Sequence, residues 1–172
     1  MTSPSPLDAN LKMINEAVYS KCGFIMSNLK LKSEGAAYSA CSFELNGYKI
    51  EHRTSRTTPA KTGQFVTIWK RGKDGITAPF DISDDIDFVV ITSGNSENLG
   101  QFIIPRVVLV EQGILSQNTK GGKRGIRVYP PWDIARSMQA VRTQHWQSKC
   151  FVTIKHDGAT DLGRVRQLFN HG

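Results

Sequence analysis

The stretch that decides the fold is YSACSFELNGYKIEHRTS, residues 38–55. Polar and apolar residues alternate over 38–45 and over 48–55, on either side of Asn46-Gly47. Alternation with a period of two is typical of a half-buried strand, and Asn-Gly is the strongest short signal for a type I′ turn. We therefore predict a tight β-hairpin here.

The two-residue turn also predicts the register of this hairpin. Leu45 should lie opposite Tyr48, and Phe43 opposite Ile50. One face then carries apolar side chains, and we predict that it belongs to the core: Cys41, Phe43, Leu45, Tyr48 and Ile50. The other face carries charges and is expected to be a surface: Glu44, Lys49, Glu51 and Arg53.

Hydrophobic spacing and turn residues predict the remaining elements. Helices are expected at 7–21 with Asp8 in the first turn, from Pro105 to about 113, at 137–149, and at 161–169 with Thr160 as N-cap. Strands are expected at 64–71, 86–92, 101–104, 126–129 and 150–154. Together these elements predict an α+β fold with a mainly antiparallel or mixed sheet of about five strands flanked by helices.

Length and composition favour one domain. The chain has 172 residues, 39% of them hydrophobic, which is enough for a core without disulfides or metal. We expect a short flexible tail over 1–6 and a single domain over 7–172. No segment reads as a signal peptide or a membrane span, so a cytoplasmic protein without membrane association is expected. The three cysteines lack zinc-type spacing and are expected to be reduced and mostly buried.

The charge is unevenly distributed. The formal net charge is +7, which favours polyanionic partners. Residues 49–73 carry seven Lys or Arg against one acid, whereas residues 81–111 carry six acids against Arg106 alone. A segregated pattern of this kind indicates a site more strongly than the total charge does.

Two groups of cations are candidate contacts to a nucleic-acid backbone, because several cations on neighbouring strands and loops can reach successive phosphates. The first group is Arg53, Arg56, Lys61, Lys70, Arg71 and Lys73. The second, in a glycine-containing loop, is Lys120, Lys123, Arg124 and Arg127. This loop lacks the Gly-Lys-Ser/Thr ending of a nucleotide-binding loop. The alternative is a solvated charged rim.

Several segments resemble the MepB family, in the same order along the chain. They are PAKTGQFVTIWKR at 59–71, GKRGIRVYPPWD at 122–133 and TQHWQ at 143–147, with PF at 79–80, DF at 87–88 and GQFIIP at 100–105 between them. The family is named after a gene beside a multidrug efflux pump. Because its members have no agreed activity, the resemblance implies a shared fold only. The order of helix, hairpin and strand is also similar to the core of PD-(D/E)XK nucleases, which bind duplex DNA and often cleave it with magnesium.

Nuclease chemistry needs carboxylates that hold a divalent metal, with a lysine nearby. Glu51-His52-Arg53 is the nearest approach to a Glu-x-Lys pair, but arginine cannot give up its proton. Asp84, Asp85 and Asp87 could supply a second ligand. Glu51, Asp85 and Asp87 are therefore the catalytic candidates, and magnesium is implied only under this alternative.

The sequence thus predicts a protein that binds nucleic acid, with DNA as the leading candidate, and that has no cofactor or catalysis. Trp69 and Trp146 are expected in the core, while Trp132 is a candidate for base stacking. The alternatives are a magnesium-dependent nuclease, and a module that binds a protein or small molecule through the 81–111 stretch or the basic loop.

Overall fold

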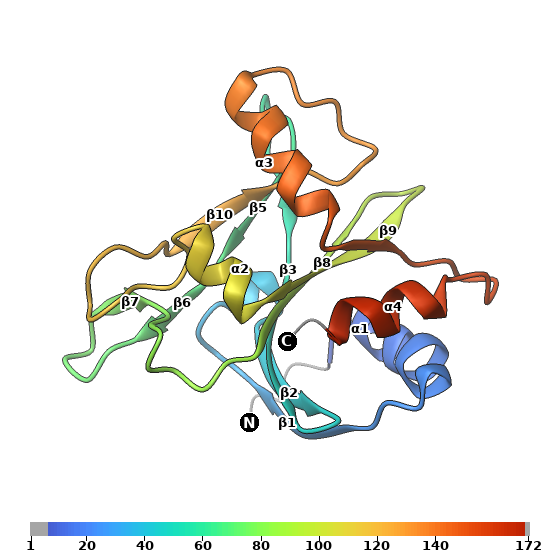
Figure 1. The fold of residues 1–172 in the computed structure, drawn as a ribbon, viewed down its shortest axis with the longest axis horizontal. Helices are drawn as coiled ribbons and strands as arrows, with labels where there is room; N and C mark the ends of the chain where they lie inside the picture. The colour runs from blue at the N-terminus through green and yellow to red at the C-terminus, as the bar shows by residue number, and fades with distance from the viewer. Residues whose placement is uncertain (1–6, 171–172) are drawn as a thin grey trace, which may run out of the picture.

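The computed structural model describes residues 7–170, so the predicted tail over 1–6 lies outside the described residues. A six-stranded sheet forms the centre of the fold (Figure 1). In spatial order its strands are β1 (Met26–Leu31), β2 (Cys41–Leu45), β3 (Tyr48–Thr54), β8 (Phe88–Gly94), β9 (Leu99–Pro105) and β11 (Phe151–Thr153). Strands β3 and β8 are parallel and the other neighbours antiparallel. The predicted α+β fold with a mixed sheet is confirmed.

The predicted hairpin forms β2 and β3 with the expected register. Leu45 pairs with Tyr48 and Phe43 with Ile50. Asn46 and Gly47 have φ angles of 49° and 84°, the positive values that a type I′ turn requires at both central residues. The first strand is shorter than predicted, because residues 36–38 form a 3₁₀ turn, η3 (Ala36–Tyr38).

One face of the main sheet is covered by helices from the two ends of the chain (Figure 1). The first helical segment passes from α1 (Ala9–Ile14) through a π-helical turn, η1 (Asn15–Tyr19), into a 3₁₀ turn, η2 (Ser20–Cys22). The last is α4 (Leu162–Phe169). They bury apolar residues against the predicted core face of the hairpin, which is thereby confirmed.

Each of these two helices begins slightly later along the chain than predicted. Asp8 precedes α1 as its N-cap, and its carboxylate accepts hydrogen bonds from the backbone N–H of Asn10 and Leu11 at 3.0 and 3.1 Å. Asp161, and not Thr160, caps α4 by accepting from the N–H of Arg164 at 3.0 Å. Both carboxylates thus satisfy N–H groups that have no partner within the helix.

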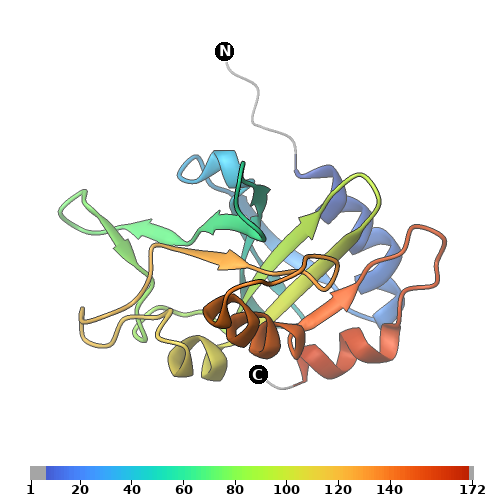
Figure 2. The ribbon, with the colours of Figure 1, turned by 90° about the horizontal axis from the view of Figure 1, so that it is seen from above.

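The other face of the main sheet carries a smaller sheet and two helices (Figure 2). The small sheet has the order β10 (Gly125–Val128), β5 (Gln64–Thr67) and β4 (Arg56–Thr57). A further pair is β6 (Trp69–Arg71) with β7 (Thr77–Pro79), and the helices are α2 (Arg106–Glu111) and α3 (Met138–Ser148). The predicted strand over 64–71 is therefore split at Ile68, which turns into the core.

The cysteines are free thiols buried in the core, as predicted. Burial raises the pKa of the Cys41 thiol to about 12, so this group stays protonated at neutral pH. Among residues 7–170, no helix combines the length and apolar character needed to cross a bilayer.

Two glutamines of α3 fasten the segment that follows β10. Gln147 is buried; its amide nitrogen donates to the carbonyl of Arg127 at 3.0 Å, and its side-chain oxygen accepts from the N–H of Tyr129 at 2.8 Å. It therefore occupies the open edge of β10 as a neighbouring strand would. Gln144 donates to the carbonyls of Pro130 and Asp133 at 3.0 and 2.9 Å. The TQHWQ motif thus has a structural role.

Replacing Gln147 by leucine should lower the free energy of unfolding by roughly 2–3 kcal/mol, because two backbone groups lose their partners. Denaturant unfolding of the purified variant measures this change. Gln139 is exposed on the same helix, so Gln139→Leu serves as the matched control and should stay near wild type. Equal stability of the two variants would contradict the role assigned to Gln147.

Candidate functional site

The charged face of the hairpin is partly buried. Glu51 is 8% exposed and Arg53 only 2% exposed. Nζ of Lys32 lies 2.7 and 2.9 Å from the two carboxylate oxygens of Glu51, and Nη1 of Arg53 lies 3.2 Å from one of them. The ring of Phe80 covers both cations, at 5.6 Å from Lys32 and 5.9 Å from Arg53. The expectation that Arg53 and Glu51 lie on an open surface is therefore wrong.

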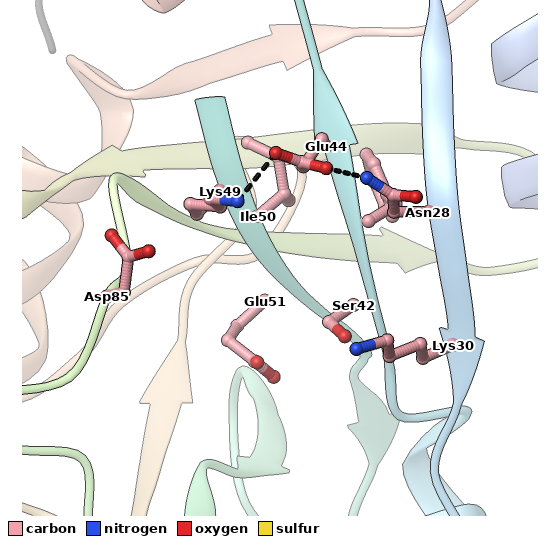
Figure 3. A pocket seen from close by; sticks show the side chains of 9 residues that line it. Asn28, Lys30, Ser42, Glu44, Lys49, Ile50, Glu51 and Asp85 are labelled. Atoms are coloured by element: carbon pink, nitrogen blue, oxygen red, sulfur yellow. Dashed lines mark hydrogen bonds and ion pairs between the residues drawn. The ribbon is translucent and has the colours of Figure 1, made fainter. Parts of the chain in front are cut away.

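A groove of about 390 Å³ lies beside this ion cluster, over β1, β2 and β3 (Figure 3). Glu51 and Asp85, both catalytic candidates, line it together. Asp87 has a structural role instead, because its carboxylate accepts from the backbone N–H of Lys49 at 2.7 Å. The ammonium group of Lys49 lies 2.6 Å from the carboxylate of Glu44, which also accepts from Asn28. The groove is lined by both signs of charge.

The groove does not fit a divalent metal. Within residues 7–170, no group of three or more His, Cys, Asp or Glu side chains is close enough to hold one. Both carboxylate oxygens of Glu51 already accept from Lys32, and one accepts from Arg53. A metal would have to displace these cations, so we derive no catalytic step through magnesium.

The ten predicted nucleic-acid contacts divide into two groups. Arg53 pairs with Glu51, Nζ of Lys70 lies 2.6 Å from Asp84, and Arg71 donates to both carboxylate oxygens of Glu34 at 2.8 and 3.0 Å. These three cations are engaged in ion pairs, although Arg53 shares its carboxylate with Lys32. In the part of the chain that the structure describes, the other seven form no ion pair: Arg56, Lys61, Lys73, Lys120, Lys123, Arg124 and Arg127.

The small sheet brings two of these seven cations together. Phe65 of β5 pairs with Arg56 on one side and with Arg127 on the other. Directly paired residues point to the same face of a sheet. The adjacent row, Val66 with Ile126, is buried against the main sheet. Arg56, Phe65 and Arg127 therefore form a row on the outer face.

Aromatic rings accompany this row. The ring of Phe65 lies across Gly125, where an added Cβ would be 2.7 Å from its Cζ atom. The ring of Tyr38 meets Phe65 edge-on with 6.2 Å between centroids, and the guanidinium of Arg56 lies 5.8 Å from the Tyr38 centroid. We call these residues the basic-aromatic face: Tyr38, Arg56, Phe65 and Arg127.

Other predicted cations border this face. Arg127 donates from Nη1 to the carbonyl of Thr62 at 3.1 Å, which ties β10 to the loop that carries the exposed Lys61. Arg124, just before β10, donates to the carbonyl of Thr77 in β7 at 3.1 and 3.3 Å. Lys73 is exposed in the turn between β6 and β7. Lys120 and Lys123 are exposed in the loop before β10.

The sequence did not single out Tyr38, Phe65 or Arg136. Alternation in β5 shows that Phe65 and Val66 face opposite sides, but it does not show which side meets the main sheet. Arg136 is exposed and lines a second groove, of about 580 Å³, together with Lys61. Only the pairing of β10 with β5 and the position of the loop over 58–63 reveal these neighbours.

The three tryptophans are distributed differently from the prediction. Trp69 is partly exposed and outside both core clusters, with the guanidinium of Arg71 at 5.6 Å from its ring centroid. Trp132, expected to be available for stacking, packs edge-on against Phe151 at 5.7 Å. Trp146 packs against the core as predicted.

The fold and site define an α+β protein whose side sheet bears a basic-aromatic face. The family model described as MepB-like matches residues 32–153. The protein in the crystal structure of MepB is 32% identical in sequence to this chain. The two structures match over 76% of this chain and 87% of the MepB chain, with a TM-score of 0.73. The chain belongs to the MepB-like family, and the resemblance seen in the sequence is confirmed.

A bacterial homing endonuclease of known structure is 16% identical in sequence to this chain. The match covers 84% of this chain and 91% of the endonuclease chain, with a TM-score of 0.45. Comparison with curated proteins gives no match.

Proposed function

We propose that this protein binds nucleic acid through the basic-aromatic face and the adjoining Lys61, without catalysis. The observation that carries the proposal is the row formed by Arg56, Phe65 and Arg127. Two arginines that have no acidic partner among the described residues stand on either side of an aromatic ring. Unpaired cations attract phosphates, and aromatic rings beside them can stack on bases.

The arrangement of acids supports this choice of surface. Three acids of the segment over 81–111 are engaged within the fold, namely Asp81, Asp84 and Asp87. Asp81 accepts from Ser116, Ser83 and Thr119, and these hydrogen bonds hold the pKa of its carboxyl well below the usual range. Asp84 pairs with Lys70. Within residues 7–170, the cations in ion pairs therefore all lie outside the small sheet, and those of the small sheet have no acidic partner.

Replacing Arg56 and Arg127 together by glutamine should weaken binding on the order of 10- to 100-fold at low salt, because two phosphate contacts are lost. The slope of log affinity against log salt should fall by about 2. Fluorescence anisotropy with labelled DNA and RNA oligonucleotides across a salt series measures both quantities.

The matched control replaces two exposed lysines elsewhere, Lys12 of α1 and Lys155 after β11, by glutamine. It removes the same net charge and should bind within about twofold of wild type. If both double variants lose the same affinity, binding depends on total charge and the basic-aromatic face is not the site. If wild type binds no nucleic acid at low salt, the proposed function fails.

A second candidate function, a magnesium-dependent nuclease, is favoured only by the position of Glu51 and Asp85 in one groove. The cations that hold Glu51 argue against it. The same binding samples, incubated with magnesium or manganese, are analysed on a denaturing gel. We expect intact oligonucleotides; cleavage that Glu51→Gln removes would replace the non-catalytic proposal.

A further inference from the structure

We infer that the nucleic acid bound at the basic-aromatic face is single-stranded, with one base stacked on Phe65 and the flanking phosphates at Arg56 and Arg127. The inference rests on the proposed function and specifies its ligand. The observation behind the inference is that an aromatic ring lies between two cations. Phosphate binding alone would require the cations but not the ring.

The ring of Phe65 is placed for stacking by the residue beneath it. Atoms Cζ and Cε2 would lie 2.7 and 3.2 Å from a Cβ at position 125, so the ring covers Gly125 on the neighbouring strand. A larger residue at this position would push the ring away from the sheet. Phe65 remains partly exposed and belongs to neither core cluster. The ring therefore lies along the sheet surface without being needed for the core.

The cations fit the two sides of a stacked nucleotide. Arg56 and Arg127 are on the strands next to β5, and neighbouring strands are about 4.8 Å apart, so their backbones are about 10 Å apart across Phe65. A base on the ring would leave its sugar-phosphate backbone within reach of both long side chains. The guanidinium of Arg56 also lies over Tyr38, which provides a second ring beside the first.

A duplex would not use this arrangement. Its bases are stacked on one another, so a ring on a flat sheet cannot reach a base face unless the strands separate. Single strands offer unpaired bases, and stacking on an aromatic side chain tolerates every sequence because every base has a π-face. The geometry therefore favours single-stranded DNA or RNA with little sequence preference.

The test compares Phe65→Leu with Phe65→Trp in the full chain. Labelled single strands of DNA and RNA, and a duplex of the same sequence, are titrated by fluorescence anisotropy at several salt concentrations. Wild type should bind the single strands at least about 10-fold more tightly than the duplex. Phe65→Leu should lose about 10-fold on single strands with an unchanged salt slope, because the phosphate contacts remain. Phe65→Trp should retain binding.

A second readout reports stacking directly. A single strand with 2-aminopurine in place of one adenine should be quenched further by wild type than by Phe65→Leu, with thermal unfolding confirming that both variants are folded. Equal affinity for duplex and single strands, insensitive to Phe65→Leu, would overturn the inference and leave the proposed function intact. Absence of binding to all three ligands at low salt would overturn both.

Discussion

Replacing Glu51 by alanine is expected to lower the free energy of unfolding by about 3–5 kcal/mol, because it breaks a buried ion cluster by removing one partner. Arg53 is 2% exposed and would keep its charge, since guanidinium groups do not lose their proton in proteins. The carbonyl of His52, at 2.9 Å, and the ring of Phe80 would be its remaining partners. Lys32 is less affected, because it can turn toward water. Denaturant unfolding with circular dichroism measures the loss.

A double variant separates uncompensated charge from lost packing. Glu51→Met with Arg53→Met removes both charges and keeps apolar volume, so it should be more stable than Glu51→Ala. A matched surface variant, Glu34→Ala, removes the partner of the exposed Arg71 and should cost at most about 1 kcal/mol. If Glu51→Ala costs no more than Glu34→Ala, the cluster is not a significant source of stability.

For this ion cluster, the sequence predicts which strand face the residues share but not that the face is buried. Alternation in β3 correctly assigns Glu51 and Arg53 to the face opposite Ile50. It cannot show that Phe80, far along the chain, folds over that face. Charge counts also do not reveal pairing: Lys70 and Arg71 belong to the most basic segment, yet acids outside that segment neutralise them.

The fold was predictable where the signal is local. The Asn-Gly turn fixed the hairpin register, and hydrophobic spacing predicted the helical segments before β1 and after β11. Strand β1 was missed. It is an edge strand with mostly exposed residues, and Asn28, with a φ of 53°, interrupts its pairing with β2. The parallel pairing of β3 with β8 was also missed, because it joins segments that the small sheet separates along the chain.

The interior of the main sheet contains a chain of hydrogen bonds centred on His52, which is fully buried. The hydroxyl of Tyr19 donates to the side-chain oxygen of Gln101 at 2.6 Å, and the amide of Gln101 donates to the hydroxyl oxygen of Thr92 at 3.0 Å. The hydrogen of Thr92 is then available to Nε2 of His52 at 2.8 Å. Neutral His52 accepts at Nε2 and carries its proton on Nδ1, which faces Cys41 at 3.7 Å.

His52 should make the protein sensitive to mild acid. Burial lowers the pKa of His52 from 6.5 to about 4 in the folded state; the carboxylate of Asp8 opposes this shift and the charge of Arg53 adds to it. Between these pH values the unfolded chain binds a proton that the folded chain does not, so the free energy of unfolding decreases as the pH falls. The contribution of neutral His52 to the free energy of unfolding is fully present above about pH 6.5. Roughly 3 kcal/mol of this contribution is lost by about pH 4.

Denaturant unfolding at pH 7 and at pH 4.5, for wild type and His52→Gln, tests this expectation. Glutamine can accept the hydrogen bond from Thr92 but does not titrate, so the variant should be less stable at pH 7 and should lose less stability on acidification. Other groups contribute equally to both proteins, and the difference between the two pH dependences therefore isolates His52. Identical pH dependences would show that His52 does not titrate differently on unfolding. A smaller dependence in the variant would show that burial and the hydrogen-bond chain keep a neutral imidazole in the core.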